Sequence, residues 1–235
     1  MRRLAITLGA VVCARSAGAG AQTPPVPCPA GAVLVPRATV HIGHGVQPPW
    51  ADHIESIAAF CIDRDEFTVV RYRQCVAAGS CFPSIWCGQD QANPALACVT
   101  AIEAESHCRA YGGSLPTESQ WEYAARGLDG RPYPWGQAAP TWQSLPLSLA
   151  AGADGATVMA ESERTPFGLR HMLDGLAEWT STTAASPLDV PHRIVKGTHD
   201  FVRPLWEHGT IDERSRSPTV GFRCVYRVGT KTITY

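Results

Sequence analysis

Short apolar stretches, broken by glycine and proline, recur along the chain and predict β-strands. They lie at residues 32–42, 57–63, 176–180, 193–197 and 220–228. β-Branched and aromatic residues bounded by turn formers are typical of strands. Pro36 interrupts the first stretch. Because proline cannot donate to a strand ladder, an edge strand or a hairpin is expected there.

Three helices are predicted, each from a threonine that caps its first turn. Thr68, Thr100 and Thr117 precede segments with helical spacing of apolar residues. Thr100 and Thr117 are followed three positions later by glutamate or glutamine, which indicates a capping box. Glycines at 79, 112 and 127 mark the helix ends. Three short helices among many short strands and long loops predict a single, irregular α+β domain.

The N-terminus has the pattern of a secretory signal peptide. Two arginines precede an apolar stretch at 4–12, and small residues at 19–21 provide a cleavage site. We therefore expect a signal peptide over 1–21, a mature domain over 22–235, and a periplasmic or extracellular location. The apolar stretch is too short to span a bilayer, and no later segment is predicted to do so.

A lipoprotein anchor and a nucleic-acid partner are both disfavoured. Cys13 follows Val12, which is bulky where a lipidation site needs a small residue. The 20 basic and 21 acidic residues nearly balance, so no basic surface for nucleic acid or an anionic membrane is indicated.

Eight cysteines follow the predicted leader: Cys28, Cys61, Cys75, Cys81, Cys87, Cys98, Cys108 and Cys224. An even number in an exported chain predicts disulfides. No two cysteines have the C-x-x-C spacing typical of zinc sites. The sequence alone leaves the pairing open.

One run, GGSLPTESQWEYAARG at residues 112–127, resembles a signature segment of the formylglycine-generating enzyme (sulfatase-modifying factor) family. Residues 61–68, 107–113, 133–136, 167–180 and 221–224 resemble further family motifs in the same order. The resemblance implies a loop-rich, C-type-lectin-like fold. It also implies a disulfide between Cys108 and Cys224.

The resemblance does not extend to the residues of the family's oxidase chemistry. Oxidase members bind copper(I) through two cysteines that follow a glycine-containing strand. Aligning Gly197 with that strand places Val202 and Glu207 at the two thiol positions, and no cysteine lies between Cys108 and Cys224. Because copper(I) prefers soft thiolate ligands, we expect no copper-thiolate chemistry and name no cofactor with confidence.

Calcium is a second cofactor that the resemblance brings in. Family members bind it partly through asparagine side chains, which this chain lacks at the matching positions. Asp154 and Asp174 are the candidate oxygen ligands that remain.

Other polar and aromatic residues lie where the family has its active site. His199, Glu207 and His208 are candidates for proton transfer or metal binding, with a solvated polar loop as the alternative. Trp142 and Trp206 are candidates to line a ligand groove.

Two hypotheses of function follow. The first is an exported pseudoenzyme that binds an unidentified protein or small molecule through the loops at 128–165 and 198–216. The second is a periplasmic oxidoreductase, or another enzyme of the same fold, with chemistry that does not use cysteine.

Overall fold

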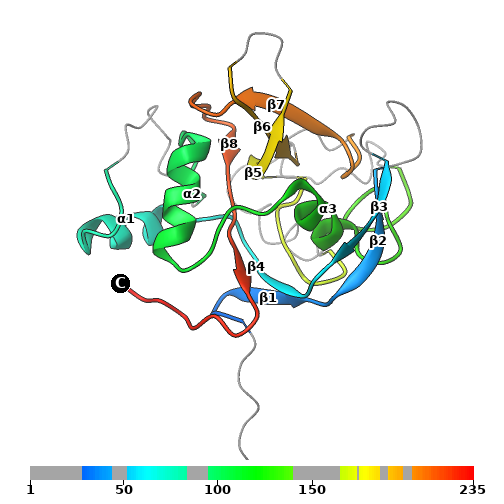
Figure 1. Cartoon of the computed structure of the whole chain (residues 1–235), viewed down its shortest axis with the longest axis horizontal. Coiled ribbons are helices and arrows are strands. Elements are labelled where there is room, and N and C mark those ends of the chain that lie inside the picture. Colours follow the sequence, from blue (N-terminus) through cyan, green and yellow to red (C-terminus); the bar gives the residue numbers. More distant parts are fainter. Residues whose placement is uncertain are drawn as a thin grey trace, which may run out of the picture.

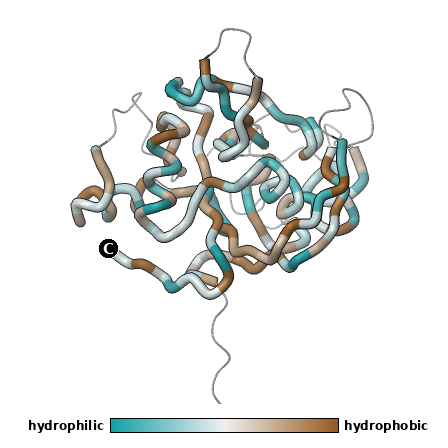
Figure 2. Tube along the Cα trace, in the orientation of Figure 1, coloured by the Kyte–Doolittle hydropathy of each residue, from teal (hydrophilic) through white to brown (hydrophobic). Residues whose placement is uncertain are grey.

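The computed structural model describes residues 28–43, 52–83, 95–139, 165–173, 175–185, 190–197 and 203–235. The predicted signal peptide and the central part of the loop at 128–165 lie outside the described residues. Within the described part of the chain, no helix is long and apolar enough to cross a membrane. Figure 2 shows hydrophobic and hydrophilic residues mixed along the trace.

The strands are β1 (Ala32–Val35), β2 (Ala38–Ile42), β3 (His53–Ile57), β4 (Phe60–Asp63), β5 (Ala177–Ala184), β6 (His192–Lys196), β7 (His208–Asp212), β8 (Val220–Gly221) and β9 (Val225–Arg227). The helices are α1 (Val69–Ala77), α2 (Ala101–Ala110) and α3 (Glu118–Arg126). This mixture of short helices and short strands confirms the predicted α+β class.

Among the described residues, the strands form three small sheets. One has the order β1-β4-β9, the second is the β2-β3 hairpin, and the third has the order β7-β6-β5-β8. All neighbours are antiparallel except β5 and β8, which are parallel. The four-stranded sheet lies at the top of Figure 1 and β1 and β4 lie at the bottom, with α2 and α3 on either side of the centre.

Helix starts follow the predicted capping chemistry. The side chain of Thr68 accepts a hydrogen bond from the backbone N–H of Arg71. Thr100 and Thr117 each take part in a complete capping box, with Glu103 and Gln120 respectively. Each box satisfies two N–H groups that the helix itself leaves without partners. These local signals therefore place the three helix starts correctly.

Two strands, β3 and β7, were missed, and several predicted strands have different bounds. Residues 32–42 form β1 and β2, residues 220–228 form β8 and β9, and the two members of each pair lie in different sheets, while β5 extends to Ala184. Residues 57–63 are not one strand, because Ile57 ends β3 and β4 begins only at Phe60. β7 lies within 198–216, where the sequence predicted only a loop. Its pairing with β6 is non-local, and its sequence, HGTID, has no regular alternation of apolar residues. Tertiary pairing, which local propensity does not capture, forms this strand.

Three disulfides are described: Cys28–Cys61, Cys75–Cys81 and Cys108–Cys224. The third is the pairing that the family resemblance implies, and its cysteines are 116 positions apart. Cys98 is also disulfide-bonded, whereas Cys87 lies outside the described residues.

Two large hydrophobic clusters and one small one fill the interior of the described part of the chain. One large cluster surrounds the Cys108–Cys224 disulfide and includes Phe67, Trp179 and Phe222. The other large cluster packs against α3 and includes Trp121 and Leu169. Together they fix α3 and β6, the two elements from which the candidate site is built.

Candidate functional site

The end of β6 is the position from which the family's chemistry would begin. Lys196 ends the strand, and Gly197 follows with a φ of 73°, in the left-handed region that favours glycine. A Cβ atom on Gly197 would lie 2.9 Å from the carbonyl oxygen of Met172. Both conformation and space therefore require glycine where the chain leaves β6.

Lys196 is fully buried, and its ammonium group is paired. Its Nζ donates to Glu122 Oε2 at 2.8 Å and to the carbonyl oxygen of Trp206 at 2.9 Å. Glu118 Oε1 lies 3.8 Å from the same nitrogen. The lysine thus joins β6 to the first two turns of α3 and to the segment that precedes β7.

Arg126 completes the interior side of this ionic cluster. Its Nη1 donates to Glu122 Oε1 at 2.5 Å and to the carbonyl oxygen of Gly43 at 2.7 Å. The N–H of Gly43 donates to the same glutamate oxygen at 2.7 Å. The Arg126 guanidinium also lies 5.2 Å from the centroid of the Trp206 ring. Since Glu122 is shared by two cations and an amide, we assign it a structural role.

His208 contacts the carboxylate of Glu118 on α3, not that of its sequence neighbour Glu207. Its Nδ1 lies 2.8 Å from Glu118 Oε1, and both side chains are partly buried. Burial alone would raise the pKa of Glu118, but contact with His208 and the charge of Lys196 outweigh burial and lower that pKa. The pair therefore holds an ionised carboxylate against an imidazole.

Glu207 faces the other way. Its Oε2 lies 3.3 Å from Nη1 of Arg203, and both side chains are well exposed, at 44% and 58%. Glu207 and His208 therefore do not converge on a common point. His199 and Val202 lie outside the described residues.

The remaining candidate residues are only partly described. Trp206 packs against Arg126 and belongs to the ionic cluster. Trp142, Asp154 and Asp174 lie outside the described residues. In the described ranges there is no group of three or more His, Cys, Asp or Glu side chains that could hold a metal ion.

A buried ion pair at the centre of the domain was missed by the sequence analysis. Arg223 donates to both carboxylate oxygens of Glu178, at 2.7 and 2.6 Å, and neither side chain is exposed. Trp121 Nε1 donates to Glu178 at 2.7 Å. The sequence did contain a signal for this pair. Glu178 and Arg223 each stand between two apolar residues.

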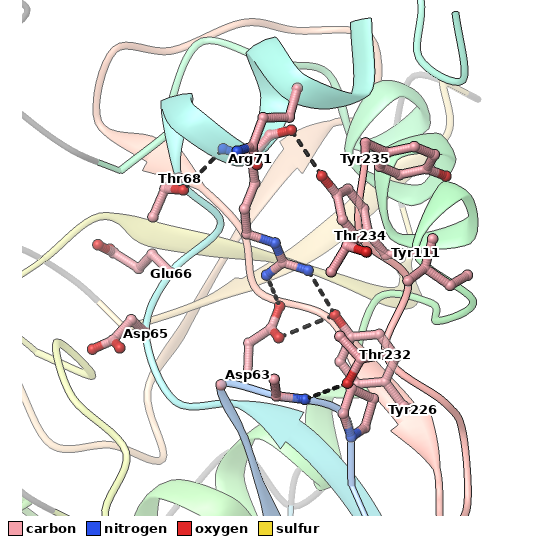
Figure 3. A pocket seen from close by; sticks show the side chains of 15 residues that line it. Asp63, Asp65, Glu66, Thr68, Arg71, Tyr111, Tyr226, Thr232, Thr234 and Tyr235 are labelled. Carbon is pink, nitrogen blue, oxygen red and sulfur yellow. Dashed lines mark hydrogen bonds and ion pairs between the residues drawn. The ribbon is translucent and has the colours of Figure 1, made fainter. Parts of the chain in front are cut away.

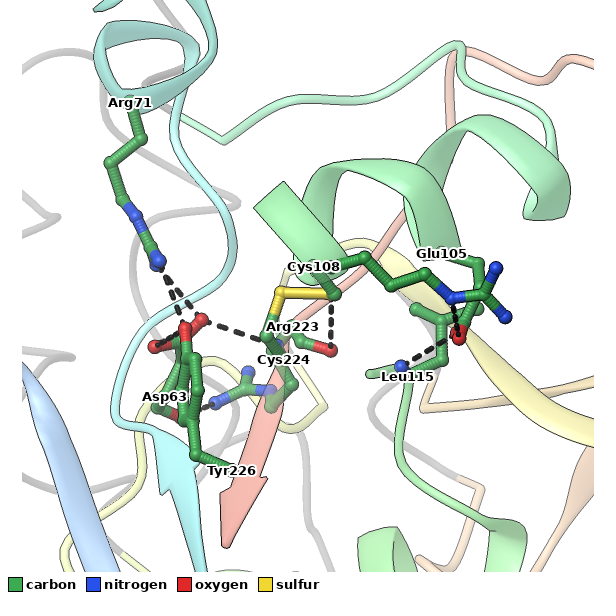
Figure 4. Close-up of a disulfide and its surroundings, with 9 residues drawn as sticks. Asp63, Arg71, Glu105, Cys108, Leu115, Arg223, Cys224 and Tyr226 are labelled. Atoms are coloured by element: carbon green, nitrogen blue, oxygen red, sulfur yellow. Dashed lines mark hydrogen bonds and ion pairs between the residues drawn. A yellow bond between two sulfur atoms is a disulfide. The ribbon is translucent and has the colours of Figure 1, made fainter. Parts of the chain in front are cut away.

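A second buried network lies beside the long-range disulfide (Figure 4). Asp63 accepts hydrogen bonds from Arg71, from Tyr226 and, at 3.2 Å, from the backbone N–H of Cys224. Burial raises the pKa of Asp63, although Arg71 and the hydrogen bonds act in the opposite direction. These residues tie β4, α1 and β9 together.

Comparison with solved structures identifies the type of fold. The solved structure of PvdO from Pseudomonas aeruginosa superposes with a TM-score of 0.62, at 15% sequence identity, over 83% of this chain and 94% of that chain. At that identity the likeness establishes the fold alone. It places the chain among loop-rich domains of the formylglycine-generating-enzyme-like, C-type-lectin-like type.

Sequence comparison then gives the family. Residues 20–228 match the sulfatase-modifying factor enzyme 1-like domain, and the chain belongs to that family.

Two relatives with contrasting names illustrate its range. Formylglycine-generating enzyme of Mycobacterium tuberculosis is 36% identical over 177 residues, covering 58% of each chain. Inactive C-alpha-formylglycine-generating enzyme 2 of Mus musculus is 29% identical over 151 residues, covering 56% of this chain and 48% of the relative. The chain thus matches about half the length of these curated relatives.

Proposed function

We propose that this protein is an exported member of the sulfatase-modifying factor family that lacks copper-thiolate formylglycine-generating activity and acts as a binding module. One observation carries the proposal: no cysteine lies between Cys108 and Cys224, and these two are joined in a disulfide. A copper(I) site of the family type needs two free thiolates after β6. The disulfides and the leader-like N-terminus support export.

The described residues around the expected thiol positions support the same conclusion. Glu207, at the second position, makes an exposed ion pair with Arg203. Lys196 and Arg126, two cations that contact the neighbouring Trp206, are both ion-paired with Glu122. Their charges therefore serve the packing of α3 against β6. The name of one relative, inactive C-alpha-formylglycine-generating enzyme 2 of Mus musculus, supports the proposed loss of activity.

The test of lost oxidase activity uses a peptide containing a sulfatase-type cysteine. The purified mature protein, supplied with copper and oxygen, should leave the peptide mass unchanged, whereas an active formylglycine-generating enzyme converts it. Conversion of the peptide by this protein would overturn the proposal.

The binding role is proposed for the loops at 128–165 and for the part of 198–216 outside β7. An affinity pull-down from periplasm or culture medium would identify the partner. Deleting part of the loop at 140–164 should abolish capture if that loop binds it. Capture unaffected by the deletion would exclude the loop.

A second candidate function is an enzyme of this fold with non-cysteine chemistry. The contact between His208 and Glu118 favours it, because a carboxylate that orients an imidazole is a common element of proton transfer. If a substrate is found, His208→Ala should abolish turnover and His208→Gln should not restore it. Turnover by both variants would exclude His208. Calcium binding through Asp154 and Asp174 remains a further proposal.

A further inference from the structure

A cavity of about 510 Å³ lies beside β9 and shares no described residue with the ionic cluster of α3 and β6. Its walls come from the turn between β3 and β4, from the link between α2 and α3, from the first turn of α3 and from residues 225–230. A cavity of this size is in the range that small molecules occupy.

This cavity lies where a strand ladder stops short. Ser114 exchanges two backbone hydrogen bonds with Val225 of β9, at 3.0 and 2.9 Å. Gly112 has a φ of 78° and its N–H donates to the carbonyl oxygen of Arg109, so this segment leaves β9 after one bridge. Because backbone groups alternate in direction along a strand, the N–H of Arg227 points to the same side of β9 as that of Val225. Within the described part of the chain nothing accepts from it, so it is available to a ligand.

The charge of the lining is positive. Arg227 is exposed, and its guanidinium has no ion-pair partner in the part of the chain that the structure describes. None of the described residues that line the cavity is acidic. The N–H groups of a guanidinium form a fork that matches a carboxylate. A single negative charge on a ligand would therefore be balanced here, and no described lining residue would repel it.

The uncharged polar groups of the lining are also available. Gln120 Oε1 accepts from the N–H of Thr117 at 3.0 Å, which leaves the side-chain amide nitrogen without a partner among the described residues. The hydroxyl groups of Ser114 and Thr230 are likewise unpaired there. An amide nitrogen donates, and a hydroxyl group both donates and accepts. These groups can therefore bond to the hydroxyl groups of a ligand.

The neighbouring pocket, between α1 and the C-terminal segment, lacks an available cation (Figure 3). Its arginine, Arg71, donates to Asp63 at 2.8 Å and to the Tyr226 hydroxyl at 2.9 Å, so its charge is already balanced. Tyr226 lines both pockets. The unpaired guanidinium of Arg227 is therefore the feature that distinguishes the cavity beside β9.

We propose that the cavity beside β9 binds a small hydroxycarboxylate. The guanidinium and the backbone N–H of Arg227 hold the carboxylate, and Gln120, Ser114 and Thr230 bond to the hydroxyl groups of the ligand. This site goes beyond the proposed binding role of the loops at 128–165 and 198–216, because no described residue of its lining belongs to them.

Calorimetric titration of the purified mature protein tests the charge requirement. D-Gluconate is the probe, and D-sorbitol is its neutral analogue, with a hydroxymethyl group in place of the carboxylate. Gluconate should bind at least about tenfold more tightly than sorbitol, because charge-assisted hydrogen bonds are the stronger class. Inorganic phosphate is the competitor. It should displace gluconate only in more than about tenfold excess, because it lacks the chain of hydroxyl groups.

Two variants test the location. Arg227→Gln removes the cation and should weaken gluconate binding by about tenfold or more. Gln120→Glu keeps an oxygen for the N–H of Thr117 but puts a negative charge in the lining. It should therefore fold, as thermal unfolding would show, and lose measurable gluconate binding. Arg109→Gln is the matched control and should bind as the wild type does, since that side chain is 72% exposed and does not line the cavity.

The absence of gluconate binding, equal binding of sorbitol, or displacement of gluconate by equimolar phosphate would each overturn the proposal. Gluconate binding that survives both cavity variants, or that Arg109→Gln weakens as much as they do, would also contradict it. Capture of a partner through the loops should be unaffected by either cavity variant, so the two binding proposals can fail separately.

Discussion

Two carboxylate–guanidinium pairs show how differently the two regions of this domain are built. Glu178 and Arg223 are completely buried and joined by two hydrogen bonds of 2.6 and 2.7 Å. Glu207 and Arg203 are exposed and meet at 3.3 Å. Removing one partner of a buried pair leaves an uncompensated charge in the interior, whereas exposed pairs contribute little.

This difference separates the scaffold from the position of the family's chemistry. The buried pair joins two of the motifs that carry the family resemblance, those around Trp179 and Phe222. The exposed pair contains Glu207, which the alignment of Gly197 with the family motif places at the second thiol position. The buried contacts that stabilise the scaffold therefore do not involve the exposed pair.

The largest effect is expected from breaking the buried pair. Arg223→Ala should lower the free energy of unfolding by about 3–5 kcal/mol, because Glu178 would remain buried without its cation. Urea unfolding measures the change. Arg203→Ala is the control and should change stability by less than about 1 kcal/mol. Equal losses in the two variants would remove the distinction between the regions.

Removing the long-range disulfide should give the second largest loss of stability. A Cys108→Ala/Cys224→Ala double variant should lose about 2–5 kcal/mol, because the closed loop spans 116 positions and restricts the unfolded chain. The short Cys75–Cys81 disulfide is the internal control, since its sequence separation is 6. A larger loss from removing the short disulfide would contradict the loop-closure explanation.

His107, which is buried inside the scaffold, should make the folded protein less stable in acid. Its ring packs with Phe67, Phe222 and Tyr72, and neither ring nitrogen has a hydrogen-bond partner among the described residues. Burial lowers the pKa of His107 to about 4, against about 6.5 when unfolded, although the charge of Glu103 opposes the shift. The unfolded state therefore binds more protons between these values.

Stability that is present above pH 6.5 should accordingly fall as the pH drops towards 4, by up to roughly 3 kcal/mol. Thermal unfolding of the wild type and of His107→Phe across this range measures the difference. Glu66 titrates in the opposite direction in both proteins, so subtracting the two curves removes its effect. Parallel curves would show that His107 does not titrate as proposed.

The smallest effect is expected at the partly exposed contact of β7 with α3. His208→Ala should cost about 0–1 kcal/mol, because solvent screens such a pair and Glu118 keeps Lys196 nearby. Chemical unfolding again measures the change. A loss comparable with that of Arg223→Ala would mean that the β7 contact belongs to the scaffold after all.

The parts of the fold that follow local rules could be predicted from the sequence. Thr68, Thr100 and Thr117 mark the helix starts because each cap acts within three residues of itself. β3 and β7 could not be predicted in this way, because their residues alternate poorly and only pairing in space makes them strands.

The candidate site was predicted only in outline. The family resemblance located the segment that contains Glu207 and His208, but proximity in sequence suggested that the two would act together. The structure instead pairs His208 with Glu118 and Glu207 with Arg203. Such partners are set by how α3 packs against β6 and β7, which a linear pattern does not encode.

The central claim, a family scaffold without its copper-binding thiols, is tested most directly by anaerobic copper(I) titration of the mature protein against a chromogenic chelator. The wild type should leave the chelator's copper untouched. A Val202→Cys/Glu207→Cys variant should withdraw about one equivalent, because it restores two soft ligands at the matching positions. Stoichiometric withdrawal of copper(I) by the wild-type protein would contradict the account.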